Sequence, residues 1–153
     1  MLLCGVEDRD AELRAWLRLA ATPGMDGLRA LALTRHYGSA EAALHATPKF
    51  LAAMGLGPRA LAALRTPPAM LAASLRWVDA PGRLIVRAGD PDYPPQLLTL
   101  SSAPVVLYVR GSASALAAAQ VAVVGSRRPT PAGRETSRAF ARDRKSTRLN
   151  SSH

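Results

Sequence analysis

Proline and glycine limit the length of every regular element in this chain, because 12 prolines and 11 glycines are spread along its 153 residues. Proline lacks the backbone N–H that a helix interior needs, and glycine is a common residue of turns and helix ends. In residues 1–79 these two residue types separate short helical patterns, and strand signals are absent. After residue 82 the apolar runs become shorter and richer in β-branched residues, which favours strands. The sequence therefore predicts a helical domain at 1–79 followed by an α/β domain.

Residues with helix-capping side chains set the helix boundaries that we expect in the first domain. A Ser, Thr or Asp side chain at the N-cap accepts a hydrogen bond from a free N–H of the first turn, and proline is tolerated at the first helical position. On this basis helices are expected to begin after Asp10, Asp26, Ser39 and Thr47, with further helices at 59–64 and after Pro68. In the second domain, strands are expected at Leu84–Arg87, Val105–Arg110 and Val121–Val124, with a brief helix at Gln96–Leu100.

The charge and cysteine content exclude several classes of protein. Twenty Lys and Arg against 11 Asp and Glu give a formal charge of +9, which modestly favours a polyanionic partner. Cys4 is the single cysteine, so the chain has no internal disulfide, and a reducing cytoplasm is the expected location. No apolar run reaches the roughly 20 residues that a membrane-spanning helix needs. A signal peptide pattern is also absent from the first residues.

A strand, a loop and a helix start follow one another in residues 121–133, and this segment is the main candidate site. The buried strand would deliver the chain to Gly125, after which Ser126, Arg127 and Arg128 supply a hydroxyl and two guanidinium groups. The N-terminus of the following helix attracts anions, so the segment predicts a phosphate site. The alternative is an ordinary turn, because the sequence is neither the dinucleotide fingerprint nor a P-loop.

A second candidate is the glycine hairpin around Leu56, which resembles a helix-hairpin-helix motif. Gly55 and Gly57 would let backbone amides approach a DNA phosphate, and Arg59 would add charge. The alternative is that the glycines only permit a tight turn between packed helices. A degenerate copy at 22–28 places Asp26 where a phosphate should approach, so we expect a structural role there.

Catalytic and metal-binding patterns are poor. His36 and His45 have no spacing that would pair them as metal ligands, and Asp90 with Asp92 is flanked by proline and glycine, which favours a turn. We therefore expect no enzymatic activity, no metal and no cofactor.

Three blocks of residues occur together in the second domain. They are residues 90–94 (Asp-Pro-Asp-Tyr-Pro), residues 103–111 ending in Val-Arg-Gly, and residues 121–127 followed by Thr130 and Gly133. In this combination the chain resembles the DNA-processing protein family called DprA or Smf, over roughly residues 10 to 142. The resemblance implies a small all-helical domain, of the helix-hairpin-helix or SAM-like kind, before a Rossmann-like parallel sheet.

The resemblance also implies a function. Members are cytoplasmic, non-enzymatic proteins that bind incoming single-stranded DNA during natural transformation, help to load the recombinase RecA, and form homodimers. Gly125, Ser126 and Arg127 match the family's Gly-Ser-Arg turn, and Arg127 is the best candidate for a direct DNA-phosphate contact. The family's usual tyrosine before the helix glycine is replaced by Ala132.

The chain departs from the family in length, so the resemblance implies an amino-terminal fragment. The Rossmann-like domain would begin at 80–142 and be incomplete, and residues 143–153 have a different composition that indicates a non-native tail. Two other functions stay open: a nucleotide phosphoribohydrolase with a similar first strand and turn, and a helical module that contacts protein partners.

Overall fold

The structure, a computed structural model, describes residues 4–118 and 124–149. The chain divides into two compact units, Met1–Ala118 and Ala119–His153. The first unit contains six α-helices and a two-stranded sheet among its described residues, so it combines helical and strand segments in a mixed fold. The expected boundary between residues 79 and 80 lies inside this unit, and the division into 1–79, 80–142 and 143–153 stays a prediction.

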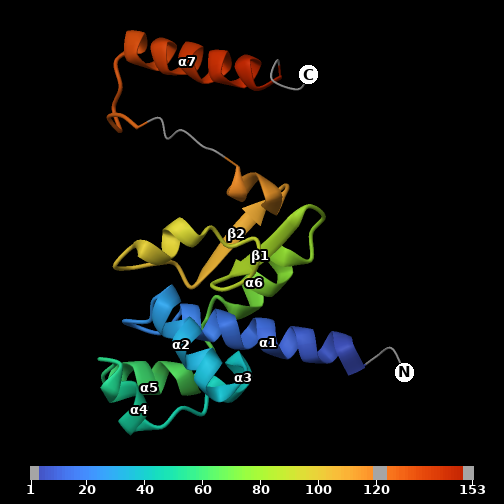
Figure 1. The fold of residues 1–153 in the computed structure, drawn as a ribbon, viewed down its shortest axis with the longest axis vertical. Coiled ribbons are helices and arrows are strands. Elements are labelled where there is room, and N and C mark those ends of the chain that lie inside the picture. The colour runs from blue at the N-terminus through green and yellow to red at the C-terminus, as the bar shows by residue number, and fades with distance from the viewer. Residues whose placement is uncertain (1–3, 119–123, 150–153) are drawn as a thin grey trace. The chain divides into compact units, whose positions relative to one another are not determined.

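Short helices form the first part of the chain, as the distribution of proline and glycine indicates (Figure 1). They are α1 (Cys4–Ala20), α2 (Gly27–Tyr37), α3 (Ala40–Ala43), α4 (Pro48–Ala53), α5 (Pro58–Arg65) and α6 (Leu71–Val78). The expected caps at Asp26, Ser39 and Thr47 are confirmed, since each side chain accepts a hydrogen bond from the N–H three residues later. The start expected after Asp10 is wrong. The helix already begins at Cys4, because residues 4–10 contain no proline and a cap-type residue can also lie inside a helix.

The strands lie close to their expected positions, but their direction differs from the expected parallel sheet. β1 (Arg83–Arg87) pairs antiparallel with β2 (Val106–Arg110), with Ile85 opposite Tyr108. The connection, residues 88–105, begins and ends at the same end of the sheet, and it contains the short 3-10 helix η1 (Pro95–Thr99). Strands joined in this way must run in opposite directions. The third expected strand, Val121–Val124, falls mainly outside the described residues.

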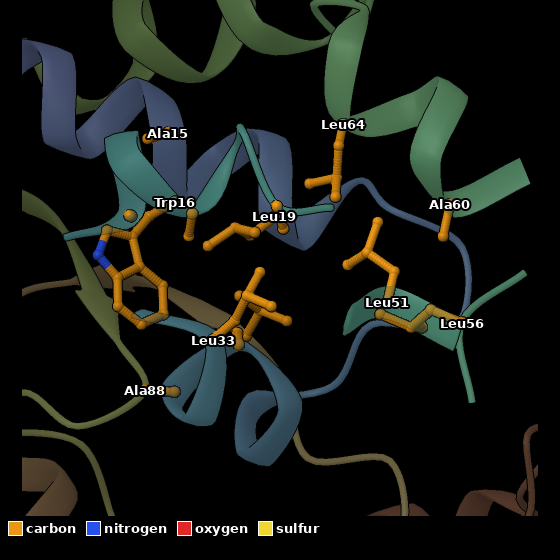
Figure 2. Close-up of a cluster of buried hydrophobic side chains, with 14 of the residues drawn as sticks. Ala15, Trp16, Leu19, Leu33, Leu51, Leu56, Ala60, Leu64 and Ala88 are labelled. Atoms are coloured by element: carbon orange, nitrogen blue, oxygen red, sulfur yellow. The ribbon is translucent and has the colours of Figure 1, made fainter. Parts of the chain in front are cut away.

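One hydrophobic core joins the helices to β1 and to the segment after it. Leu19, Leu33, Leu51 and Leu64 are fully buried, and Figure 2 shows their side chains converging from α1, α2, α4 and α5. Val86, Ala88, Tyr93 and Val105 belong to the same cluster, although they lie beyond residue 80. Full burial of such side chains stabilises a fold by about 1.5–3 kcal/mol each, so this shared core holds the helical and strand segments together.

Close contacts with the backbone carbonyl groups of Ala103 and Pro104 reinforce this packing. The N–H of Gly27 donates to the Ala103 carbonyl at 2.7 Å, and a Cβ at Gly27 would lie 2.8 Å from the Pro104 carbonyl oxygen. The Tyr93 hydroxyl donates to the same Pro104 carbonyl at 2.6 Å. Gly27 is therefore needed for close packing, which agrees with the structural role expected for the 22–28 segment.

The second unit contains α7 (Pro131–Leu149), which starts where Thr130-Pro131 predicts a helix. Its first turn is capped by Thr130, whose Oγ1 accepts a hydrogen bond from the Gly133 N–H at 3.1 Å. The first unit also includes, near its end, the 3-10 helix η2 (Ala113–Ala117).

Candidate functional site

The turn at Gly125–Arg128 is open to solvent. All four residues are exposed, and a Cβ built at Gly125 would meet no heavy atom within 4 Å. The Ser126 hydroxyl accepts a hydrogen bond from the Arg128 N–H at 3.2 Å, which bends the chain back on itself. Within residues 124–142, the Arg127 and Arg128 guanidinium groups make no hydrogen bond or ion pair. The turn thus presents two unpaired cations and an accessible backbone.

The start of α7 follows this turn directly and carries the same sign of charge. The Thr130 carbonyl accepts from the Arg134 N–H at 3.0 Å, while its hydroxyl caps Gly133. Gly133 suits this cap, because a Cβ there would lie only 3.2 Å from Thr130 Oγ1. A helix N-terminus carries about half a positive charge, so the helix and the arginines of the turn attract an anion together.

The glycine hairpin joins α4 to α5 by a tight turn. Gly55 has a φ of +77°, which favours glycine, and Gly57 is the N-cap of α5. Leu56 between them is 4% exposed and belongs to the core. Arg59 is exposed and forms no ion pair or hydrogen bond with another described residue. The packing role is thus visible, and the DNA contact of Gly55, Gly57 and Arg59 stays a prediction.

Arg29 connects this hairpin to the degenerate copy, a role that the sequence analysis missed. Its Nε donates to the Met54 carbonyl at 3.1 Å, and its guanidinium group forms an ion pair with Asp26. The two hairpins also lie close together, since a Cβ at Gly24 would lie 3.2 Å from Leu56 Cδ2. Asp26 therefore serves as the N-cap of α2 and as the ion-pair partner of Arg29. The Arg29 guanidinium group is thus bound by other groups of the first unit.

The remaining titratable candidates have structural roles. Asp90 binds Arg87 through a bidentate ion pair and also accepts from the Arg87 N–H at 2.7 Å, which confirms the expected turn. Burial raises the pKa of Tyr93 above its ordinary value. His36 stacks on Phe50 with ring centroids 4.3 Å apart. In the residues that the structure describes, no group of three His, Cys, Asp or Glu side chains is placed to hold a metal ion.

An arginine row on α7 adds to the turn and was also missed. Arg134, Arg138 and Arg142 line an open groove along one face of the helix, together with Pro131, Glu135 and Ala139. Every side chain from Pro131 to Arg142 is exposed. The spacing of four residues between the arginines was the signal in the sequence that could have found this row.

Comparison with known proteins gives one family match and one similar curated protein. Residues 84–149 match the family described as DNA recombination-mediator protein A. Protein Smf of Escherichia coli (strain K12) is 38% identical over 77 residues, which are 50% of this chain and 21% of that protein. The chain therefore spans about a fifth of the length of this curated relative. No solved structure matches the chain.

The family match contains the open turn and α7, and it begins within β1. It ends at residue 149, inside the segment 143–153 that we expect to be non-native, and the nature of that segment stays a prediction. None of the described helices is both long and apolar enough to span a bilayer.

Proposed function

We propose, from the match of residues 84–149 to the DNA recombination-mediator protein A (DprA/Smf) family, that the protein binds single-stranded DNA without sequence preference. In this proposal the bound strand is passed to the recombinase RecA during natural transformation, in the cytoplasm. The protein acts by binding, with no chemical reaction, and the complete protein is a homodimer. In this proposal the complete domain contains a Rossmann-like parallel sheet. The order of elements along the chain supports it, because the strand expected at 121–124 is followed by a turn and then by α7.

The exposed turn at Gly125–Arg128 is the observation that carries this proposal. A guanidinium group offers a planar set of donors that fits phosphate oxygens, and Arg127 has no partner among the described residues to compete for them. Gly125 adds backbone that a strand can approach closely, and Ser126 and Arg128 complete the turn. Contacts to phosphate carry no sequence information, which suits a protein that receives any incoming DNA.

The Gly55–Gly57 hairpin is a second, separate DNA contact in this proposal. The exposed Arg59 side chain, in the first turn of α5, supports it. The burial of Leu56 supports a packing role for the hairpin, and the alternative of a helical module that contacts proteins stays open. This part of the proposal therefore needs its own variant.

A binding experiment tests both contacts. Fluorescence anisotropy with two labelled single-stranded oligonucleotides of unrelated sequence, repeated at several salt concentrations, gives the affinity and its salt slope. Each lost phosphate contact lowers that slope by about 0.7, so Arg127→Ala should weaken binding and reduce the slope by about this amount. Arg59→Ala should do the same if the hairpin touches DNA. Arg14→Ala is the matched control, because Arg14 is exposed on α1 and belongs to neither the turn nor the hairpin.

The outcomes separate the proposed functions. Unchanged binding in Arg127→Ala would show that the turn does not contact DNA. Unchanged binding in Arg59→Ala alone would leave the helical segment as a protein-contact module. Hydrolysis of a nucleoside monophosphate by the complete protein would favour the phosphoribohydrolase instead.

A further inference from the structure

The arginine row of α7 has a regular geometry. Arg134, Arg138 and Arg142 follow one another at intervals of four residues, and each interval advances about 6 Å along the helix. Side chains four residues apart lie on the same face, so the three guanidinium groups form a single row. In the part of the chain that the structure describes, none of the three forms an ion pair or a hydrogen bond through its side chain.

This row does not stabilise the helix that carries it. Like charges four residues apart disfavour a helix by about 0.2–0.5 kcal/mol per pair, and the row contains two such pairs. Glu135 lies in the same groove but forms no ion pair with an arginine among the described residues. A bound polyanion would offset the repulsion, whereas folding alone gains nothing from this arrangement.

The row continues the charge of the open turn. Residues 124–142 contain five arginines and one glutamate, a net charge of +4 within 19 residues. Arg127 and Arg128 precede the positive end of α7, and the row follows it. The positive charge of the turn is therefore followed by that of the helix, and Glu135 is the one acidic residue in this segment.

The opposite face of α7 has a different character. At 100° per residue, Gly133, Thr136 and Phe140 lie on the side away from the arginines. Small and apolar side chains are suited to packing against other parts of a protein. Packing through that face would leave the arginine row open to solvent.

We propose that Arg134, Arg138 and Arg142 form a track that binds successive phosphates of the single strand held at the Gly125–Arg128 turn. The proposal rests on the proposed function and extends its site along α7. A single row of cations follows one phosphate backbone, which favours one strand of DNA over a duplex. The contacts are to phosphate, so the track lengthens the footprint of the protein and adds no sequence preference.

A triple variant tests the track in the 153-residue chain. Replacing the three arginines by glutamine, as R134Q, R138Q and R142Q together, removes three charges and keeps residues with good helix propensity. The salt slope for a single-stranded oligonucleotide should fall by about 2, at about 0.7 for each of three contacts. The matched control is R14Q, R76Q and R110Q together, which removes the same charge from exposed positions of the first unit and should leave the slope unchanged.

A second variant keeps the test independent of helix stability. Replacing the same three arginines by lysine retains the charge and should restore most of the slope, since phosphate binding needs cations rather than the guanidinium shape alone. Circular dichroism of all variants shows whether α7 keeps its helix.

The outcomes distinguish this proposal from the function on which it rests. If the parent chain binds no single strand, both fail. If Arg127→Ala weakens binding while the glutamine triple variant matches its control, only the track is wrong. If the lysine variant is as weak as the glutamine variant, charge is not the cause and the track is also wrong. An equal or larger loss for a duplex of the same sequence would contradict the choice of single strands.

Discussion

Replacing Gly89 by alanine should destabilise the first unit through two effects that the structure separates. Gly89 follows β1 with a φ of +93°, where a residue with a Cβ costs about 1–2 kcal/mol. The new Cβ would also lie 2.7 Å from Leu31 Cδ1, so the Leu31 side chain on α2 must move. Leu31 is only partly buried and Cδ1 is the end of its side chain, so turning this side chain away costs about 0.5–1.5 kcal/mol. We therefore expect a total loss of about 1.5–3.5 kcal/mol in the free energy of unfolding.

Gly111→Ala is the matched control. Gly111 follows β2 with a φ of +107°, and a Cβ there would meet no heavy atom within 4 Å. This variant should lose only the backbone cost of about 1–2 kcal/mol. The difference between the two variants then measures the contact between Gly89 and Leu31.

Urea unfolding measured by tryptophan fluorescence provides the assay. Trp16 lies on α1 and Trp77 on α6, so both tryptophans report on the first unit. A single transition that shifts further for Gly89→Ala than for Gly111→Ala is expected. Equal shifts would refute the contact, and two separate transitions would refute one shared core for the helices and strands.

Two further variants test contacts between distant segments. Tyr93→Phe should lower the free energy of unfolding by about 1 kcal/mol at neutral pH, because it removes the hydrogen bond to Pro104. Burial raises the Tyr93 pKa, so this group stabilises the parent below pH 10, and that contribution is lost as the pH rises through the raised value. Urea midpoints at rising pH should therefore fall more in the parent than in Tyr93→Phe, and parallel curves would contradict this reasoning. Glu12→Ala should cost about 1.5–3 kcal/mol, because the carboxylate accepts hydrogen bonds from the Ala40 and Glu41 N–H groups at the start of α3. Glu12→Gln, which keeps one acceptor oxygen, should lose less, and an unchanged urea midpoint in Glu12→Ala would show that this cap does not contribute.

Local chemistry explains which parts of the fold the sequence could predict. The caps at Asp26, Ser39 and Thr47 depend on atoms within three residues, so they are visible in the sequence. The strands and the helix after Thr130 were predictable for the same reason, since each has its own pattern of apolar or turn residues. These expectations needed no knowledge of tertiary packing.

Contacts between distant residues explain what the sequence could not predict. Glu12 caps α3 from 28 positions away, and Gly27 meets the backbone of Ala103 and Pro104, which no local pattern indicates. The pairing of β1 with β2 depends on how the connection returns, rather than on the composition of either strand. In the candidate site, the turn was predictable from its residue types, while the role of Arg29 inside the fold was not.

The two units should respond to substitution in different ways, because different forces shape their surfaces. In the first unit, buried side chains such as Leu33 and Tyr93 join helices to strands, so changes there act on stability. In residues 124–142, nearly every side chain is exposed and five arginines have no described side-chain partner, so little burial is lost when one is replaced. Substitutions of Arg127 or of the arginine row are therefore expected to have little effect on folding and to act on the proposed DNA binding. Loss of binding in these variants can accordingly be assigned to the charge that was removed.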